Sequence, residues 1–167
     1  MAAIAFFEDA PRAYLLCGKV GAGKTTYALE LESRGAMRLS LDEWTLHFYA
    51  TPEVSRAVFD AQVATCREMI LCVAEQVVAK GISVVLDLGF WRRAERDSAR
   101  QRMHAAGALP LLYWFDIPDE EQLRRLAQRN AALPVGTYEI TPAMLEEFAQ
   151  RFEAPIMEEG FVAPPPI

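Results

Sequence analysis

Residues 18–25 read Gly-Lys-Val-Gly-Ala-Gly-Lys-Thr, and this stretch decides the fold. It fits the phosphate-loop pattern, in which two glycines are separated by four residues, and the second glycine is followed by a lysine and then by a serine or threonine. The short apolar run at 13–17 before it predicts a buried strand, and residues 24–34 after it predict a helix. The pattern therefore stands between a strand and a helix, the context that it requires, and it predicts a site for a nucleoside triphosphate.

Each part of this loop has an expected task. Glycines allow successive backbone N–H groups to point inward at a phosphate, and the N-terminus of the following helix adds partial positive charge. We expect Lys24 to reach the β- and γ-phosphates of ATP and the Thr25 hydroxyl to bind Mg²⁺. The residues expected to contact the nucleotide are Gly18, Lys19, Val20, Gly21, Ala22, Gly23, Lys24, Thr25 and Thr26.

The rest of the chain alternates between short apolar runs and longer amphipathic ones. Strands are expected at 37–41, 82–87 and 109–117, and helices at 51–80, 92–106, 119–130 and 141–152. Fully apolar strands alternating with helices predict an α/β fold, in which a parallel sheet lies between two layers of helices and ligands bind at the carboxyl ends of the strands. We therefore expect one domain over 1–153, followed by a loosely attached tail at 154–167.

The composition limits the kind of partner and the cellular location that we expect for this protein. The 167 residues are 52% hydrophobic and carry a net charge of −6, which favours a small-molecule partner over nucleic acid. No apolar run approaches the ~18 residues of a membrane span, and the first residues lack the basic start of a secretory signal. The three cysteines show no Cys-x-x-Cys spacing. We expect a cytoplasmic protein without a membrane segment, and its oligomeric state stays open.

The phosphate-loop classes can be separated by what else the sequence contains. No Asn-Lys-x-Asp motif of a GTPase switch surrounds Lys80, the only lysine outside the loop, and Asp87 is followed by Leu88 rather than by the glutamate of ring ATPases. Small kinases remain, and they have an arginine-bearing lid late in the chain. The arginine-rich run at 123–130 and the loop at 134–140 predict such a lid within residues 119–141.

With these motifs, the chain resembles the phosphate-loop kinases that include polynucleotide 5′-kinases, chloramphenicol phosphotransferase and zeta toxins. The resemblance covers about residues 13–153. It implies a five-stranded sheet in the order 2-3-1-4-5, with ATP, Mg²⁺ and phosphoryl transfer to a hydroxyl. No fifth strand is evident in the sequence, although residues 161–163 offer a stub, so the expected order is 2-3-1-4.

Two carboxylates follow strands at the expected ligand edge. Asp42 comes after the second strand, and the resemblance implies that it is the base that takes the proton of the acceptor hydroxyl. The alternative is that it caps a turn at 43–44. Asp87 ends the third strand beside Thr25, where it would hold a water on Mg²⁺. A helix cap or a loop hydrogen bond is its alternative role.

Arginines supply the positive charge that phosphoryl transfer needs. Arg125 and Arg129 lie four residues apart on one helical face, and the resemblance aligns Arg129 and Asn130 with the Arg-Asn of a polynucleotide-kinase lid. Pairing of Arg125 with Glu121 is the alternative. Arg92 is a candidate for the substrate site. The later arginines of the same helix are expected to be exposed and paired with neighbouring acids.

Aromatic residues also follow the strands. Trp44 is a candidate for the acceptor pocket, and Phe48, Tyr49, Phe90 and Trp91 would complete its wall unless they pack in the core.

The leading hypothesis is an ATP-dependent kinase that acts on a hydroxyl of a small molecule, for which the resemblance suggests a sugar nucleotide or an antibiotic. A polynucleotide or nucleoside 5′-kinase is the runner-up. Its patterns Asp-x-x-Arg and Arg-Asn-x-x-Arg are both broken here, because Thr45 and Leu133 occupy the last positions. A nucleotide-dependent binding module with slow ATPase activity is the third reading.

Overall fold

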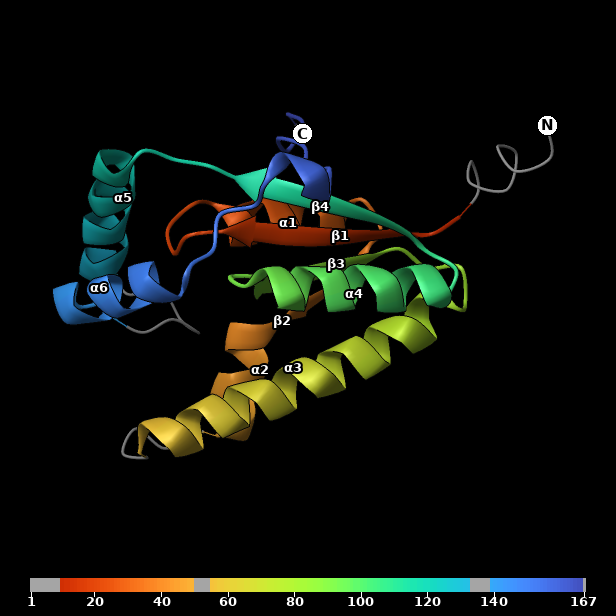
Figure 1. Ribbon diagram of the computed structural model, residues 1–167, viewed down its shortest axis with the longest axis horizontal. Helices are drawn as coiled ribbons and strands as arrows, with labels where there is room; N and C mark the ends of the chain where they lie inside the picture. The colour runs from red at the N-terminus through yellow and green to blue at the C-terminus, as the bar shows by residue number, and fades with distance from the viewer. Residues whose placement is uncertain (1–9, 50–54, 133–138, 167) are drawn as a thin grey trace.

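A computed structural model of the protein describes residues 10–49, 55–132 and 139–166. Its centre is a sheet of four parallel strands (Figure 1), which are β1 (Arg12–Gly18), β2 (Met37–Ser40), β3 (Val84–Gly89) and β4 (Leu109–Phe115). The strand order is β2-β3-β1-β4, which confirms the predicted order 2-3-1-4. The carboxyl ends of all four strands therefore meet at one edge of the sheet.

Helices cover both faces of the sheet, which confirms the three-layer architecture. These helices are α1 (Lys24–Ser33), α3 (Arg56–Val78) and α4 (Arg93–Ala105). Leu15 and Leu86 belong to one buried cluster with residues of α3 and α4, whereas Leu16 and Val85 belong to a second with residues of α1. Successive strand residues thus face opposite layers, as the pleat of a strand buried on both faces requires.

The helix α2 (Leu41–Phe48) is an element that we did not predict from the sequence. Residue 41 was expected to end the second strand, but β2 ends at Ser40, whose side chain accepts a hydrogen bond from the Glu43 N–H at 3.4 Å and begins a helix. A serine followed three residues later by a glutamate is a typical helix start. Ser40 is therefore the cap, and the alternative role of Asp42 as a cap is wrong.

Smaller differences concern element ends. β3 begins and ends two residues later than predicted, and β4 ends at Phe115. The described part of α3 begins after Ser55, whose side chain accepts a hydrogen bond from the Val58 N–H, and the Thr51-Pro52 start that we expected lies outside the described residues. The remaining elements are α5 (Asp119–Ala132), α6 (Pro142–Arg151) and a short 3₁₀ helix, η1 (Met157–Glu159).

A fifth strand is reduced to a single bridge. Val162 pairs in parallel with Tyr113 of β4, through hydrogen bonds to the Trp114 N–H and the Leu112 carbonyl, each 3.0 Å long. This bridge lies in the stub at 161–163 that the sequence offered. It is placed beside β4, where the fifth strand of the order 2-3-1-4-5 belongs.

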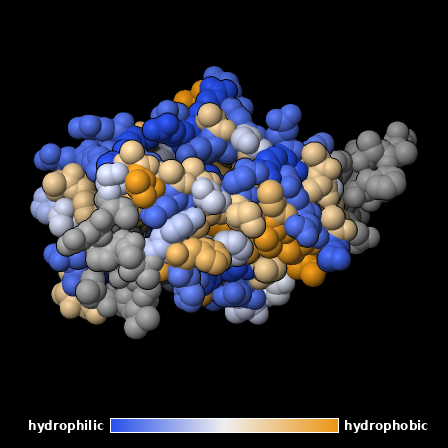
Figure 2. Space-filling view, turned by 90° about the horizontal axis from the view of Figure 1, so that it is seen from below, coloured by the Kyte–Doolittle hydropathy of each residue, from blue (hydrophilic) through white to orange (hydrophobic). Residues whose placement is uncertain are grey.

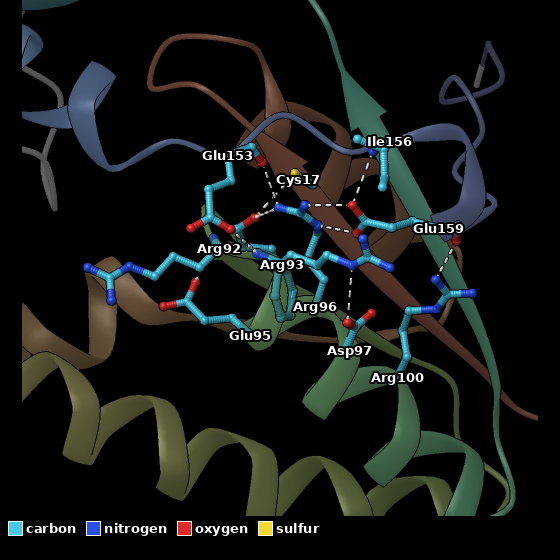
Figure 3. Close-up of polar contacts among 11 residues, drawn as sticks. Cys17, Arg92, Arg93, Glu95, Arg96, Asp97, Arg100, Glu153, Ile156 and Glu159 are labelled. Carbon is cyan, nitrogen blue, oxygen red and sulfur yellow. Dashed lines mark hydrogen bonds and ion pairs between the residues drawn. The ribbon is translucent and has the colours of Figure 1, made fainter.

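The segment that contains Val162 is held to the domain by a buried ion pair (Figure 3), so it is not the loosely attached tail that we predicted. The Arg96 guanidinium of α4 donates two hydrogen bonds to the Glu159 carboxylate, at 2.6 and 2.8 Å. Its third nitrogen donates to the carbonyls of Phe90 and Glu153. Both side chains of the pair are only 1% exposed.

The burial of Arg96 also corrects the expectation that the later arginines of this helix are exposed. The other arginines of α4 contact several partners rather than only their neighbours in sequence. Arg93 pairs with Asp97 as expected, but Arg102 pairs with Glu68 and Glu75 of α3.

Figure 2 views the face that carries α3 and shows hydrophobic residues in separate groups among hydrophilic ones. Exposed apolar residues of this helix include Val58 and Met69. Within the described residues, no helix combines the length and the apolar character that crossing a membrane would take.

Removing the Glu159 carboxylate should destabilise the protein strongly. In Glu159→Ala, Arg96 would remain buried without its counter-charge, which typically costs about 3–5 kcal/mol. The free energy of unfolding, measured by urea denaturation, should fall by that amount. Glu30→Ala is the matched control, because Glu30 pairs with Arg34 on the exposed surface of α1, and its loss should stay below about 1 kcal/mol. Equal losses in both variants would contradict this account.

Candidate functional site

The phosphate loop lies between β1 and α1, as the sequence predicts. Gly21 and Gly23 have φ values of 79° and 97°, in the left-handed region that side chains other than glycine rarely adopt. Gly23 is also the N-cap of α1, and because glycine has no side chain, no side-chain hydrogen bond caps this helix. The first-turn N–H groups of this helix thus remain available at a helix N-terminus, which suits an anion.

Lys24 lies across this loop. Its amino group donates hydrogen bonds to the carbonyls of Gly18 at 2.8 Å and of Lys19 at 2.6 Å. Burial lowers the pKa of Lys24, while the nearby carboxylates of Asp87 and Asp42 oppose that shift. The loop therefore holds a cation within reach of any phosphate that binds there.

Thr25 and Asp87 are joined directly. The Thr25 hydroxyl donates a 2.8 Å hydrogen bond to the carboxylate of Asp87, which is 8% exposed. Burial raises the pKa of Asp87, whereas the bond from Thr25 and the charge of Lys24 lower it. The described residues hold no group of three or more His, Cys, Asp or Glu arranged for a metal. One hydroxyl and one carboxylate nevertheless fit Mg²⁺, which takes few protein ligands and completes its shell with phosphates and water.

Asp42 stands at the same edge of the sheet. Ser40 of β2 pairs with Asp87 of β3, and Asp42 follows two residues later in the first turn of α2. Asp42 is exposed as a residue, yet the protein around its carboxyl group still desolvates it. This desolvation and the charge of Asp87 raise the pKa of Asp42, and Lys24 and Arg129 oppose the rise. Two carboxylates and two cations thus influence one another electrostatically.

The two arginines of α5 reach different parts of this region. Arg129 is half-buried, and its charge acts on both Lys24 and Asp42. Arg125 lies against the loop, where its Nη1 donates to the Ala22 carbonyl at 3.3 Å, and it also pairs with Glu121. Arg125 therefore lies near the loop, as a site residue should, and also pairs with Glu121, as its alternative role predicted.

Sequence reasoning placed Asn130 in the lid beside Arg129 but predicted no contact for it. Its side-chain amide donates to the Ile140 carbonyl at 2.9 Å and accepts from the Ile140 N–H at 3.1 Å. Ile140 is 3% exposed. These two bonds join the end of α5 to the residues just before α6, so Asn130 fixes the two ends of the expected lid loop. The signal that could have found it is an asparagine among the last residues of a polar helix, next to a loop that must close.

The expected acceptor residues have different surroundings. Trp44 is half-buried against the core and contacts Phe48 edge to face at 5.9 Å between ring centres. The Arg92 side chain is exposed at the start of α4. Phe90 is buried in the core with a positive φ of 47°. Trp44 and Phe90 therefore show the core packing that was the alternative to an aromatic wall.

Trp91 instead lines a cavity of about 290 Å³ on another side of the phosphate loop. Lys19 and Val20 of the loop form part of its wall, together with residues of α5 and α6 such as Leu123 and Phe148. The lining is mostly apolar, and Lys19 forms an ion pair with Asp119 at its margin.

Of the predicted nucleotide residues, Gly18 ends β1, and the others lie in the β1–α1 connection or in the first turn of α1. Those that the structure brings toward this connection from elsewhere are Asp42, Asp87, Arg125 and Arg129. Thr26 is exposed on α1. A parallel sheet in the order β2-β3-β1-β4 with a phosphate loop after β1 defines a P-loop nucleotide-binding domain of the kinase-like type.

Comparison with known families agrees with this class. Residues 14–155 match the model of the family described as an AAA domain, so the chain belongs to this family. A comparison with curated proteins found no match.

Solved structures share the fold. An unliganded sugar kinase from Janibacter sp. HTCC2649 is 17% identical, with a TM-score of 0.64 over 92% of this chain and 84% of that one. The APS kinase of Mycobacterium tuberculosis, in complex with AMPPNP and APS, is 19% identical, with a TM-score of 0.63 over 87% and 84%. A chain of the Pnkp1/Rnl/Hen1 complex is 18% identical, with a TM-score of 0.59 over 70% of this chain, which spans only 39% of that longer one.

Replacing Lys24 tests the phosphate loop. Lys24→Met keeps the length of the side chain but removes the cation, and a hydrogen bond to a charged group contributes about 1.5–3 kcal/mol. The affinity for Mg·ATP, measured by calorimetry, should fall by roughly 10- to 100-fold. Lys80→Met is the control, because Lys80 is exposed and lies outside the loop. A folded Lys24→Met protein with unchanged affinity for Mg·ATP would contradict the assignment of the nucleotide site.

Proposed function

We propose that this protein is a kinase that transfers the γ-phosphate of Mg·ATP to a hydroxyl group of a small molecule. The observation that carries the proposal is the position of the Asp42 carboxylate, at the carboxyl edge of the sheet within the electrostatic influence of Lys24 and Arg129. ATP hydrolysis needs a residue that orients a water at the γ-phosphate, whereas transfer to an acceptor needs a base for the proton of its hydroxyl. A carboxylate with a raised pKa beside the phosphate cations is what a kinase needs to take a proton from an acceptor.

In this proposal, Asp42 accepts the proton of the acceptor hydroxyl. Asp42 lies at the end of β2, two strands away from β1 in the sheet. The acceptor would therefore approach from the β2 side, while the nucleotide lies on the loop after β1. This arrangement allows the attacking and leaving oxygens to stand on opposite sides of the transferred group, as in-line displacement requires.

The cations have separate tasks in the proposal. Lys24 binds the phosphates from the loop, and Arg129 neutralises charge that builds on the transferred phosphoryl group, since its charge acts on both Lys24 and Asp42. Thr25 and Asp87 would hold Mg²⁺, the latter through a water. When bound, Mg²⁺ would offset negative charge between the β- and γ-phosphates.

A polynucleotide acceptor has less support. Polynucleotide kinases have the pattern Asp-x-x-Arg, but here the residue three positions after Asp42 is Thr45. Thr45 is buried, with 8% of its surface exposed. Leu133 lies outside the described residues. The net charge of −6 also disfavours a long polyanion. A binding module with slow ATPase activity remains the alternative that the experiments below distinguish.

The general base is tested by Asp42→Asn, which keeps the size of the side chain and removes the proton acceptor. Acceptor-dependent phosphoryl transfer should fall by about 10²–10⁴-fold, and Mg·ATP affinity should change little. The measurement is ADP formation with and without a panel of hydroxylated metabolites, followed by mass analysis of the product. Asp97→Asn is the control on the exposed face of α4. Full transfer by Asp42→Asn would remove this residue from the reaction, and a wild-type protein that no acceptor stimulates would favour the ATPase.

The arginine is tested by Arg129→Lys, which keeps the charge but loses the planar fork of donors. If Arg129 contacts the transferring group, kcat should fall at least tenfold while Mg·ATP affinity changes less than threefold. Arg124→Lys is the control, since Arg124 lies on the exposed side of the same helix and pairs with Glu121. Equal changes in kcat and affinity, or none in either, would place Arg129 outside the transition state.

A further inference from the structure

Helix α5 lies directly on the outer side of the phosphate loop. The Gln122 side-chain amide donates a 2.9 Å hydrogen bond to the Val20 carbonyl, and Arg125 donates to the Ala22 carbonyl at 3.3 Å. Between these contacts, the Leu126 side chain lies 3.1 Å from the point where a Cβ on Gly21 would stand. A side chain at residue 21 would therefore displace the helix from the loop.

These two carbonyl contacts determine where two amide hydrogens point. In a trans peptide the C=O of one residue and the N–H of the next point in opposite directions, and every described peptide bond is trans. Because Val20 and Ala22 direct their carbonyls at α5, the N–H groups of Gly21 and Gly23 point away from it. The intervening Ala22 N–H bonds to the Lys19 carbonyl at 3.3 Å and serves the turn itself.

The loop needs such an external constraint because of its composition. Glycine populates positive and negative φ with similar ease, so the peptides before Gly21 and Gly23 have little intrinsic preference for one orientation. Their left-handed conformations create a concavity lined by N–H groups only if the carbonyls stay on the other side. Lys24 contacts the carbonyls of Gly18 and Lys19 and leaves those of Val20 and Ala22 to α5.

We infer that Gln122 is a positioning residue for nucleotide binding, because it holds the Val20 carbonyl outward and thereby presents the Gly21 N–H to the phosphates. The inference rests on the proposed nucleotide-binding function. Arg125 holds the next carbonyl in the same way, but it also stands among the candidate catalytic residues. Gln122 therefore separates the positioning effect from the chemistry.

The test is Gln122→Met, which keeps the length and neutrality of the side chain and removes the donor. Gln128→Met makes the same change on an exposed position of the same helix. Calorimetry with Mg·ATP should show about fivefold weaker binding for Gln122→Met, the effect of losing one hydrogen bond, and no change for Gln128→Met. Melting temperatures of both variants should stay close to that of the wild type.

A spectroscopic readout separates positioning from a general loss of structure. In ¹H–¹⁵N spectra, the Gly21 amide of the wild type and of Gln128→Met should shift downfield when Mg·ATP is added, and this shift should shrink in Gln122→Met. If Gln122→Met does not fold, Gln122→Asn, whose amide is too short to reach Val20, replaces it with the same expected losses. Wild-type affinity and an unchanged Gly21 shift in these variants would overturn the inference alone. A wild-type protein that binds no Mg·ATP would overturn the proposed function with it.

Discussion

The buried contact between Arg96 and Glu159 is the constraint on which much of the structure depends. A buried guanidinium must have its donors satisfied. Arg96 takes its acceptors from the β3–α4 connection, from Glu153 just after α6 and from the C-terminal 3₁₀ helix. The Phe90 carbonyl that it contacts also accepts a hydrogen bond from the Cys17 thiol at 3.3 Å, next to the first glycine of the phosphate loop. The C-terminal segment is thus joined to the carboxyl edge of the sheet, where the site lies.

At that edge, the site is divided between rigid and connecting elements. Strands place Asp87, and helix starts place Thr25 and Asp42, so these three side chains depend on backbone that many other contacts fix. The two arginines come from α5, whose position depends on contacts with the loop and on the bonds between Asn130 and Ile140. The same helix that supplies positive charge thus also fits closely against Gly21. In the proposed kinase, nucleotide binding and phosphoryl transfer would therefore both depend on this one helix.

Local patterns were enough to predict the layers and the phosphate loop, because hydrophobic period and glycine spacing act over a few residues. The strand order came from the resemblance to phosphate-loop kinases, because no local pattern specifies which strands are neighbours. Asp87 and Thr25 could be paired from the sequence because the strand order places β3 beside β1. The contacts that we missed join distant residues: no local signal connects Arg96 with Glu159, 63 positions later, and the arginine looked like its exposed neighbours. Helix α2 was missed although Ser40 and Glu43 carried its start signal, because the apolar residues before them favoured a longer strand. The same unrecognised helix carries Trp44, which packs against the core as its alternative role predicted.

The single bridge at Val162 has a consequence for how this protein behaves among other copies of itself. An uncovered edge strand offers free N–H and C=O groups to any other extended chain and invites aggregation. Val162 occupies such groups in the middle of β4, and Pro164, Pro165 and Pro166 follow it. Proline has no N–H and cannot extend a ladder. Val162 therefore covers part of the edge of β4, and the three prolines that follow prevent the pairing from extending further.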